Sequence, residues 1–149
     1  MSLKERLQED WKEALKAKDK FKANVISMAK ASVLQVEKTD NVKLSDDEII
    51  VILSKEVKKR RDAMLDFEKG KRQDLVDEAK AEIEILLNYL PQQLTEEEIT
   101  KYVQEAATEV GANSIKDMGK VMAAVTSKTK GCADGKLVSK IVKEYLNRL

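Results

Sequence analysis

The segment MGKVMAAVTSKTKGCADGKLVSKIVKEYL, residues 118–146, contains two amphipathic patterns on either side of a glycine-rich turn. Apolar residues three and four positions apart form one face of a half-buried helix. They are Met118, Val121, Met122 and Val125 in the first pattern, and Leu137, Ile141, Val142, Tyr145 and Leu146 in the second. We therefore expect two short helices joined by residues 131–135. Gly131 is expected to take the left-handed conformation that ends the first helix, and Asp134 to cap the second.

Lysine side chains are concentrated around this corner. Residues 111–149 contain eight Lys and Arg against three Asp and Glu, whereas the whole chain has a net charge of only +1. A helix N-terminus attracts anions, because free N–H groups and the positive end of the helix dipole point outward. The pattern predicts a phosphate-binding surface formed by Lys120, Lys128, Lys130, Lys136 and Lys140, with Asp134 as the cap at the anion site. The alternative is that these lysines only solvate the outer faces of a small helical domain.

The glycines of this segment have different explanations. Turn geometry accounts for Gly131 and Gly135 whatever the function. Gly119 lies early in a helical pattern, where glycine costs about 1 kcal/mol relative to alanine. We explain it by the close approach of another helix, in preference to the approach of an RNA backbone.

The same periodicity extends over the rest of the chain. It predicts an all-α fold of about seven helices in two helical units, with no strand. The second helix is expected to carry its apolar stripe on one face, formed by Phe21, Val25, Met28, Ala29, Ser32 and Val36. Capping boxes at residues 45–48 and 95–98 begin the third and fifth helices.

Further start and stop signals complete this prediction. Asp74 is expected to begin the fourth helix and Ser114 to cap the sixth. Pro91 ends the fourth helix, because proline clashes with a continued helix. We place the domain boundary there, with an N-terminal helical bundle of residues 1–92 and a three-helix unit of residues 93–149.

The basic run at residues 58–61, Lys-Lys-Arg-Arg, does not predict a nucleic-acid-binding stripe. Successive residues of a helix advance by about 100°, so four consecutive side chains fan over most of the circumference. Arg60 falls near the apolar line through Val57 and Met64. We expect it to be partly buried beside a carboxylate partner.

Several classes of site are excluded by composition. The chain has no histidine and a single cysteine, Cys132, so it can form neither an internal disulfide nor a Cys/His metal or nucleophile site. The acidic clusters at residues 46–48 and 96–98 are explained by helix capping. We therefore predict no catalytic residue, no cofactor and no bound metal. No apolar run is long enough to span a membrane and the N-terminus lacks the apolar core of a signal peptide, so we expect a cytoplasmic protein without membrane contact.

Three separated motifs carry a resemblance to a known family. They are residues 67–75, the Tyr89-Leu90-Pro91 segment with Gln93-Leu94, and residues 119–135. In this order they closely resemble the YqeY proteins, small bacterial proteins related to the C-terminal helical and tail domains of GatB, a subunit of the tRNA-dependent amidotransferase. The resemblance covers essentially the whole chain. It implies two helical units, the second similar to a module that contacts tRNA outside the catalytic centre.

The tail resemblance rests on a defined set of positions. These are Gly119, Lys120, Val121, Met122, Lys130, Gly131, Ala133, Asp134 and Val138. Cys132 departs from the pattern, since relatives often have a basic residue there. The catalytic and ammonia-handling region of GatB has no counterpart in this chain.

Three hypotheses for function follow. The first is an accessory module that contacts tRNA, or a tRNA-bound enzyme, in connection with tRNA-dependent amidotransfer or aminoacylation. Exposed aromatics for base stacking are scarce, and no helix is rich in Arg, Asn and Gln, so we expect phosphate and shape recognition of RNA and no DNA binding. The second is a non-catalytic adaptor that docks a protein through the N-terminal helices. The third is participation in carbon–nitrogen ligase activity with glutamine as amido donor.

Overall fold

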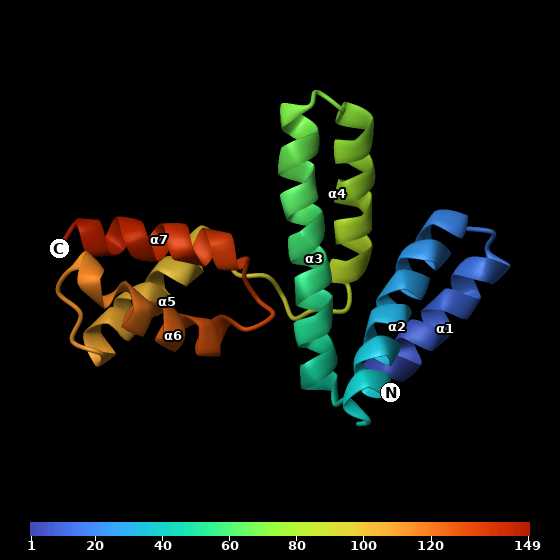
Figure 1. The fold of residues 1–149 in the computed structure, drawn as a ribbon, viewed down its shortest axis with the longest axis horizontal. Helices are drawn as coiled ribbons and strands as arrows, with labels where there is room; N and C mark the ends of the chain where they lie inside the picture. The colour runs from blue at the N-terminus through green and yellow to red at the C-terminus, as the bar shows by residue number, and fades with distance from the viewer. The chain divides into compact units, whose positions relative to one another are not determined.

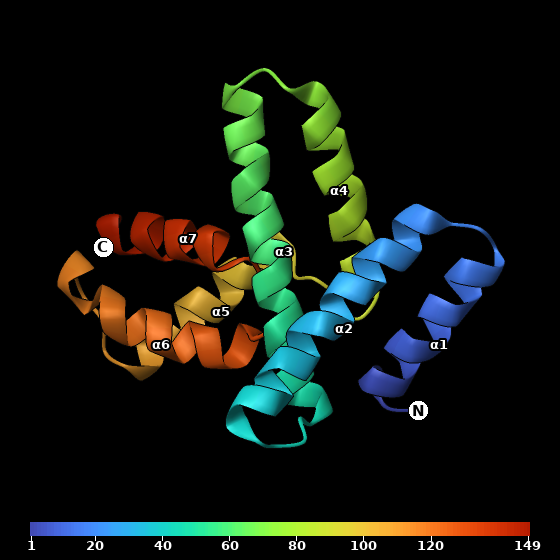
Figure 2. The same ribbon diagram turned by 45° about the vertical axis from the view of Figure 1, so that its right-hand side comes forward.

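The structure, a computed structural model, describes residues 1–149 and is all-helical (Figures 1 and 2). Seven α-helices follow one another with a short 3-10 turn, Ile115–Asp117, before the sixth. Their bounds are α1 Leu3–Lys16, α2 Lys20–Asp40, α3 Asp46–Lys69, α4 Gln73–Leu87, α5 Glu96–Glu109, α6 Met118–Thr129 and α7 Gly135–Asn147. The predicted fold class is confirmed. The chain divides into two compact units, Met1–Leu90 and Pro91–Leu149. The assignment of residues 1–92 and 93–149 as domains stays a prediction.

The first unit is built from two helical hairpins, α1–α2 and α3–α4 (Figure 1). The α1–α2 connection turns at Lys18, which has φ of 59°, and Asp19 then caps α2 by accepting a hydrogen bond from the Lys22 N–H at 3.1 Å. A single apolar core joins the four helices, with Leu7, Ile26, Leu53 and Leu86 among its most buried side chains.

The face that α2 buries overlaps only in part with the expected one, since Val25 and Ala29 are buried as predicted. Phe21 and Met28 are 38% and 55% exposed, so their assignment to the core is wrong. The buried residues are Ala23, Val25, Ile26, Ala29 and Val33. Apolar residues occupy two adjacent faces of this helix, and only the position of the neighbouring helices selects one of them.

The start of α4 also differs by one residue. The helix begins at Gln73, and its N-cap, Arg72, makes no side-chain capping bond. The Arg72 guanidinium is instead held by both carboxylate oxygens of Asp74, at 3.1 and 3.0 Å. Asp74 is therefore a first-turn acid that pairs with the cap residue, and it is not itself the cap.

The second unit packs α5, α6 and α7 around a core of small aliphatic residues that includes Val103, Val121, Val125 and Val142. The predicted capping box at residues 95–98 is confirmed, with both reciprocal hydrogen bonds present. Ser114 does not cap α6, because the 3-10 turn lies between them and its side chain makes no capping bond. That prediction is wrong, since a capping serine must directly precede the helix it caps.

Candidate nucleic-acid interface

The connection between α6 and α7 is a type II β-turn. Helix α6 ends at Thr129, whose carbonyl accepts a hydrogen bond from the Cys132 N–H at 2.9 Å. Lys130 has φ −55° and ψ 121°, and Gly131 follows with φ of 78°. These angles match a type II turn, whose third residue needs the positive φ that glycine adopts without strain. The predicted left-handed conformation of Gly131 is confirmed.

Asp134 caps α7 as predicted. Its Oδ1 accepts a hydrogen bond from the Lys136 N–H at 3.1 Å. The capping carboxylate also places a negative charge at the positive end of the α7 dipole. An anion approaching this helix end would meet that charge, so attraction at the corner depends on the lysines more than on free N–H groups.

Two residues that the sequence analysis left without a role hold the turn in place. The Gln93 side-chain amide donates to the Gly131 carbonyl at 2.8 Å, and the Leu94 N–H donates to the Cys132 carbonyl at 2.8 Å. The only sequence signal for this was that Gln93 and Leu94 belong to one of the family motifs. The segment after Pro91 therefore fixes the shape of the turn between α6 and α7.

The predicted lysines do not all lie at this corner. Lys130 lies in the turn, and Lys136 and Lys140 are one helical turn apart on the exposed side of α7. Lys120 lies in the first turn of α6, ten residues before Lys130, which corresponds to about 15 Å along a helix axis. Lys120 is therefore at the far end of α6 from the turn, and a single phosphate cannot bridge the two ends.

Lys128 has a partner within the protein. Its ammonium lies 3.0 Å from the Glu109 carboxylate at the end of α5. Such exposed pairs contribute about 0–1 kcal/mol, so a phosphate could displace the glutamate. Whether the five lysines form one phosphate-binding surface stays a prediction.

Packing does not explain Gly119. A Cβ atom built at this position would have no neighbour within 4 Å, and the same holds for Gly135. The expected close approach of another helix to Gly119 is therefore wrong. The glycine lies on the exposed side of the first turn of α6, beside Lys120.

Charge in the second unit is segregated by helix. Helix α5 carries five glutamates and one lysine, whereas residues 118–143 carry six lysines and one aspartate. The unit as a whole is close to neutral, but one helix is acidic and the other two are basic. Such a distribution orients the unit in the field of a charged partner.

A family model described as Yqey-like protein matches residues 4–146 of the chain. The chain belongs to the YqeY-like family. Some of the positions that carried the tail resemblance have a structural role, whereas Gly119 and Lys120 are exposed at the start of α6. Val121 and Val138 are buried in the core of the second unit, and Gly131 and Asp134 shape the turn.

Curated relatives of this YqeY-like chain come from fungi. A Pyrenophora tritici-repentis protein named altered inheritance of mitochondria protein 41, mitochondrial, is 33% identical over 146 residues, which is 95% of this chain and 79% of the relative. Proteins of the same name from Vanderwaltozyma polyspora and Kluyveromyces lactis are 25% identical over 150 residues and 32% identical over 102 residues. The Kluyveromyces lactis match covers 66% of this chain and 55% of the relative. These names mention neither tRNA nor amidotransfer. The cytoplasmic location that we expected, and the bacterial origin that the YqeY resemblance implies, stay predictions.

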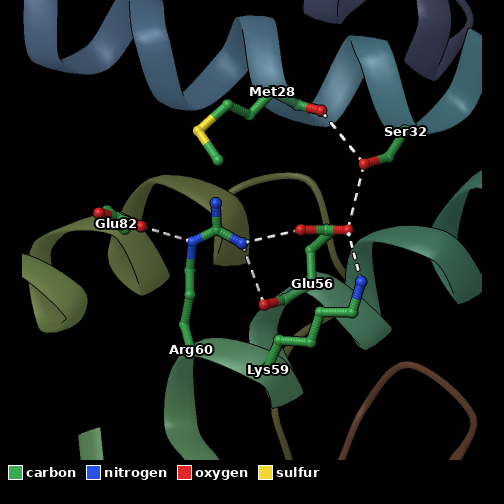
Figure 3. Close-up of polar contacts among 6 residues, drawn as sticks. All are labelled: Met28, Ser32, Glu56, Lys59, Arg60 and Glu82. Carbon is green, nitrogen blue, oxygen red and sulfur yellow. Dashed lines mark hydrogen bonds and ion pairs between the residues drawn. The ribbon is translucent and has the colours of Figure 1, made fainter. Parts of the chain in front are cut away.

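The first unit of the YqeY-like fold contains a buried ionic cluster (Figure 3). Arg60 is 8% exposed, its Nε lies 2.6 Å from Glu82 on α4, and its Nη1 lies 3.0 Å from Glu56 on α3. The Ser32 hydroxyl on α2 donates to the other Glu56 oxygen at 3.1 Å. The predicted burial of Arg60 beside a carboxylate is confirmed, and the cluster links α2, α3 and α4.

The electrostatics of this cluster suit a structural role. Burial raises the pKa of Glu56, but hydrogen bonds from Arg60 and Ser32, together with the charge of Lys59, hold it below its ordinary value. Arg60 is thus engaged by two carboxylates and is not presented to a nucleic acid. No group of His, Cys, Asp and Glu side chains in the chain is arranged to hold a metal ion. None of its helices has the length and apolar character needed to cross a membrane.

Proposed function

We propose that this YqeY-like protein is an accessory module whose second unit contacts tRNA, or a tRNA-bound enzyme, in connection with tRNA-dependent amidotransfer or aminoacylation. The supporting observation is the segregation of charge, with six lysines and one aspartate over residues 118–143 beside an acidic α5. The lysine-bearing helices would face the phosphates, and α5 would face away from them. Lys120, Lys130, Lys136 and Lys140 supply the contacts, because each is exposed to solvent.

The aromatic side chains of the second unit favour phosphate and shape recognition. Tyr102 and Tyr145 are both packed against the apolar core of the unit. Proteins that bind single-stranded RNA stack bases on exposed aromatic rings, whereas these two rings are partly buried. A folded RNA with a defined backbone path, such as tRNA, is the better match.

Binding of the full chain to deacylated tRNA at about 50 and 200 mM salt tests the proposal. Four phosphate contacts would give a slope of log affinity against log salt of about −3, which is about 60-fold weaker binding at the higher salt. A variant with Lys120, Lys130, Lys136 and Lys140 changed to alanine should lose most of this affinity.

A control variant with the same change of charge makes the test specific. Lys16, Lys20, Lys38 and Lys80 are exposed lysines of the first unit without a carboxylate partner within 4 Å. Changing these four to alanine should leave tRNA affinity within about twofold of wild type, since they lie outside the proposed surface. Equal losses in both variants would show non-specific attraction, and absence of binding at low salt would favour the adaptor hypothesis. Either result would refute a direct contact between these lysines and tRNA.

A further inference from the structure

The connection between α1 and α2 carries a local surplus of positive charge. Residues 15–22, LKAKDKFK, contain four lysines and one aspartate, a surplus of three in a chain whose net charge is +1. Lys12 and Glu13, which precede this stretch, cancel each other. None of the four lysines has a carboxylate within 4 Å. We call residues 15–22 the α1–α2 tip, and in both views it lies at the outer end of its hairpin, away from α3 and α4 (Figures 1 and 2).

Helix stability does not account for all of these lysines. Lys20 and Lys22 occupy the first turn of α2, where the helix dipole favours acids and disfavours cations. By contrast, α3 and α5 each place three acids in their first turn. Asp19 supplies the only negative charge of the tip, and its carboxylate accepts a hydrogen bond from the Lys22 N–H. Two lysines are thus placed against the preference of their own helix, which indicates a role outside the fold.

Two large apolar side chains are also exposed at the tip. Leu15, in the last turn of α1, is 50% exposed, and Phe21, in the first turn of α2, is 38% exposed. The turn between them is tight, because the Lys18 N–H donates to the Leu15 carbonyl at 3.1 Å and the Asp19 N–H donates to the Ala14 carbonyl at 2.9 Å. All of residues 15–21 are exposed. The tip therefore presents apolar and cationic side chains to solvent together.

The shape of the tip fits a broad surface better than an enclosed ligand. An apolar groove of about 630 Å³ between α1 and α2 is lined by residues between 1 and 9 and between 30 and 34, so it lies at the other end of the hairpin. Clusters of lysine bind anionic lipid headgroups, and bulky apolar side chains beside them enter the boundary of the acyl chains. A nucleic-acid backbone would pair with the lysines but would leave Leu15 exposed.

We propose that the α1–α2 tip binds the surface of an anionic lipid bilayer. Its four lysines would lie among the headgroups, and Leu15 and Phe21 would insert at the acyl boundary. We expected no membrane contact because no segment can span a bilayer, but a peripheral contact of this kind needs no such segment. The site belongs to the first unit and does not depend on the proposed tRNA contact.

Sedimentation of the full chain with lipid vesicles tests this proposal. One set of vesicles would be phosphatidylcholine alone, and the other would contain about 30% phosphatidylserine to supply negative charge. At about 50 mM salt we expect saturable binding to the anionic vesicles and none to the neutral ones. Binding should weaken at about 200 mM salt, because salt screens the attraction between lysines and headgroups.

Three lysine variants locate the contact. Changing the four tip lysines, Lys16, Lys18, Lys20 and Lys22, to alanine should weaken binding more than about 100-fold, since each lysine near such a surface contributes about fivefold. The control changes Lys38, Lys55, Lys58 and Lys80, which are exposed lysines of the first unit outside the tip. It removes the same charge and should stay within about threefold of wild type. The alanine variant of Lys120, Lys130, Lys136 and Lys140 should also lose less vesicle affinity than the tip variant.

A matched pair of leucine variants tests insertion. Leu15→Ser should weaken binding about 3- to 10-fold, because it removes apolar surface that would leave water on binding. Leu65→Ser is the control, since Leu65 on α3 is 47% exposed and lies outside the tip. Thermal unfolding of each variant separates lost binding from lost folding.

Several results would overturn the proposal. One is the absence of binding to anionic vesicles at low salt, and another is equal binding to neutral vesicles. Equal losses in the tip variant and in either of the other lysine variants would show unspecific attraction, and equal behaviour of the two leucine variants would rule out insertion. A tip variant that loses tRNA affinity but keeps its vesicle binding would assign the tip to RNA.

Discussion

Replacement of Arg60 by methionine tests whether the ionic cluster is the main polar link between α2, α3 and α4. The substitution keeps most of the side-chain volume but leaves Glu56 and Glu82 without the guanidinium that lies 3.0 and 2.6 Å from them. Breaking a fully buried pair costs about 3–5 kcal/mol, because the remaining charge is uncompensated. The two glutamate side chains are 14% and 21% exposed, so part of this cost is relieved by water. We expect a loss of about 2–3 kcal/mol in the free energy of unfolding at neutral pH.

The pH dependence of this loss has a definite sign. The pKa of folded Glu56 lies below its ordinary value of 4.5, so its ionised form stabilises the folded state above that pH. This contribution disappears as the pH falls through the folded pKa. Without Arg60, burial is expected to raise the pKa of Glu56. Protonation of Glu56 on acidification then removes the uncompensated buried charge from the variant. The difference in stability between wild type and Arg60→Met should therefore shrink between about pH 7 and pH 4.

Urea unfolding followed by circular dichroism at several pH values measures both effects. Lys59→Met is the control, because Lys59 is 3.6 Å from the same Glu56 but its side chain is 75% exposed. An exposed pair of this kind should contribute less than about 1 kcal/mol. The reasoning would be refuted if Arg60→Met cost no more than Lys59→Met, or if its cost stayed constant on acidification.

Four further substitutions test a turn glycine, with its control, and two polar contacts. Gly131→Ala should lower the free energy of unfolding by about 1–2 kcal/mol in thermal unfolding, because φ at this residue is 78°. Gly135→Ala should leave that free energy unchanged or raise it, because no atom lies within 4 Å of the added Cβ. Tyr89→Phe should cost about 1 kcal/mol at pH 7, because it removes the hydrogen bond of 2.6 Å to Asp10. Burial and that hydrogen bond raise the pKa of Tyr89 above 10.0. Wild-type stability should therefore decline as the pH rises past 10, because the unfolded state loses the Tyr89 proton first. An equal alkaline decline in Tyr89→Phe would show that Tyr89 does not cause it. Gln93→Ala should lower the melting temperature through loss of the 2.8 Å bond to the turn, and an unchanged melting temperature would show that the turn holds its shape without it.

Several features defined by a few neighbouring residues were predicted correctly from the sequence, although the caps expected at Asp74 and Ser114 do not form. The left-handed conformation of Gly131, the cap at Asp134 and the capping box at residues 95–98 all form where expected. Each of them depends on a hydrogen bond or a backbone angle within about four residues. The burial of Arg60 was also predictable, because a charged residue on an apolar helical stripe needs a carboxylate to enter the core.

Features that depend on which elements meet were missed or predicted wrongly. The buried face of α2 was predicted only in part, because two adjacent faces of that helix are apolar: Val25 and Ala29 are buried, whereas Phe21 and Met28 lie on the exposed face. The pairing of Lys128 with Glu109, and the hydrogen bond from Gln93 to the Gly131 carbonyl, join residues 19 and 38 positions apart. A local sequence pattern cannot predict contacts between residues so far apart in the chain.

By itself, the sequence determined that this protein is all-α, where most of its helices begin and end, and which segment carries the concentrated positive charge. These properties follow from helical periodicity, capping chemistry and charge counts, which act over a few residues. Only the tertiary structure decided that nothing packs against Gly119, that Lys128 pairs with Glu109, and that α1 and α2 leave an apolar groove. Those properties depend on how helices pack against one another, because packing determines which side chains are covered and which charges find a partner.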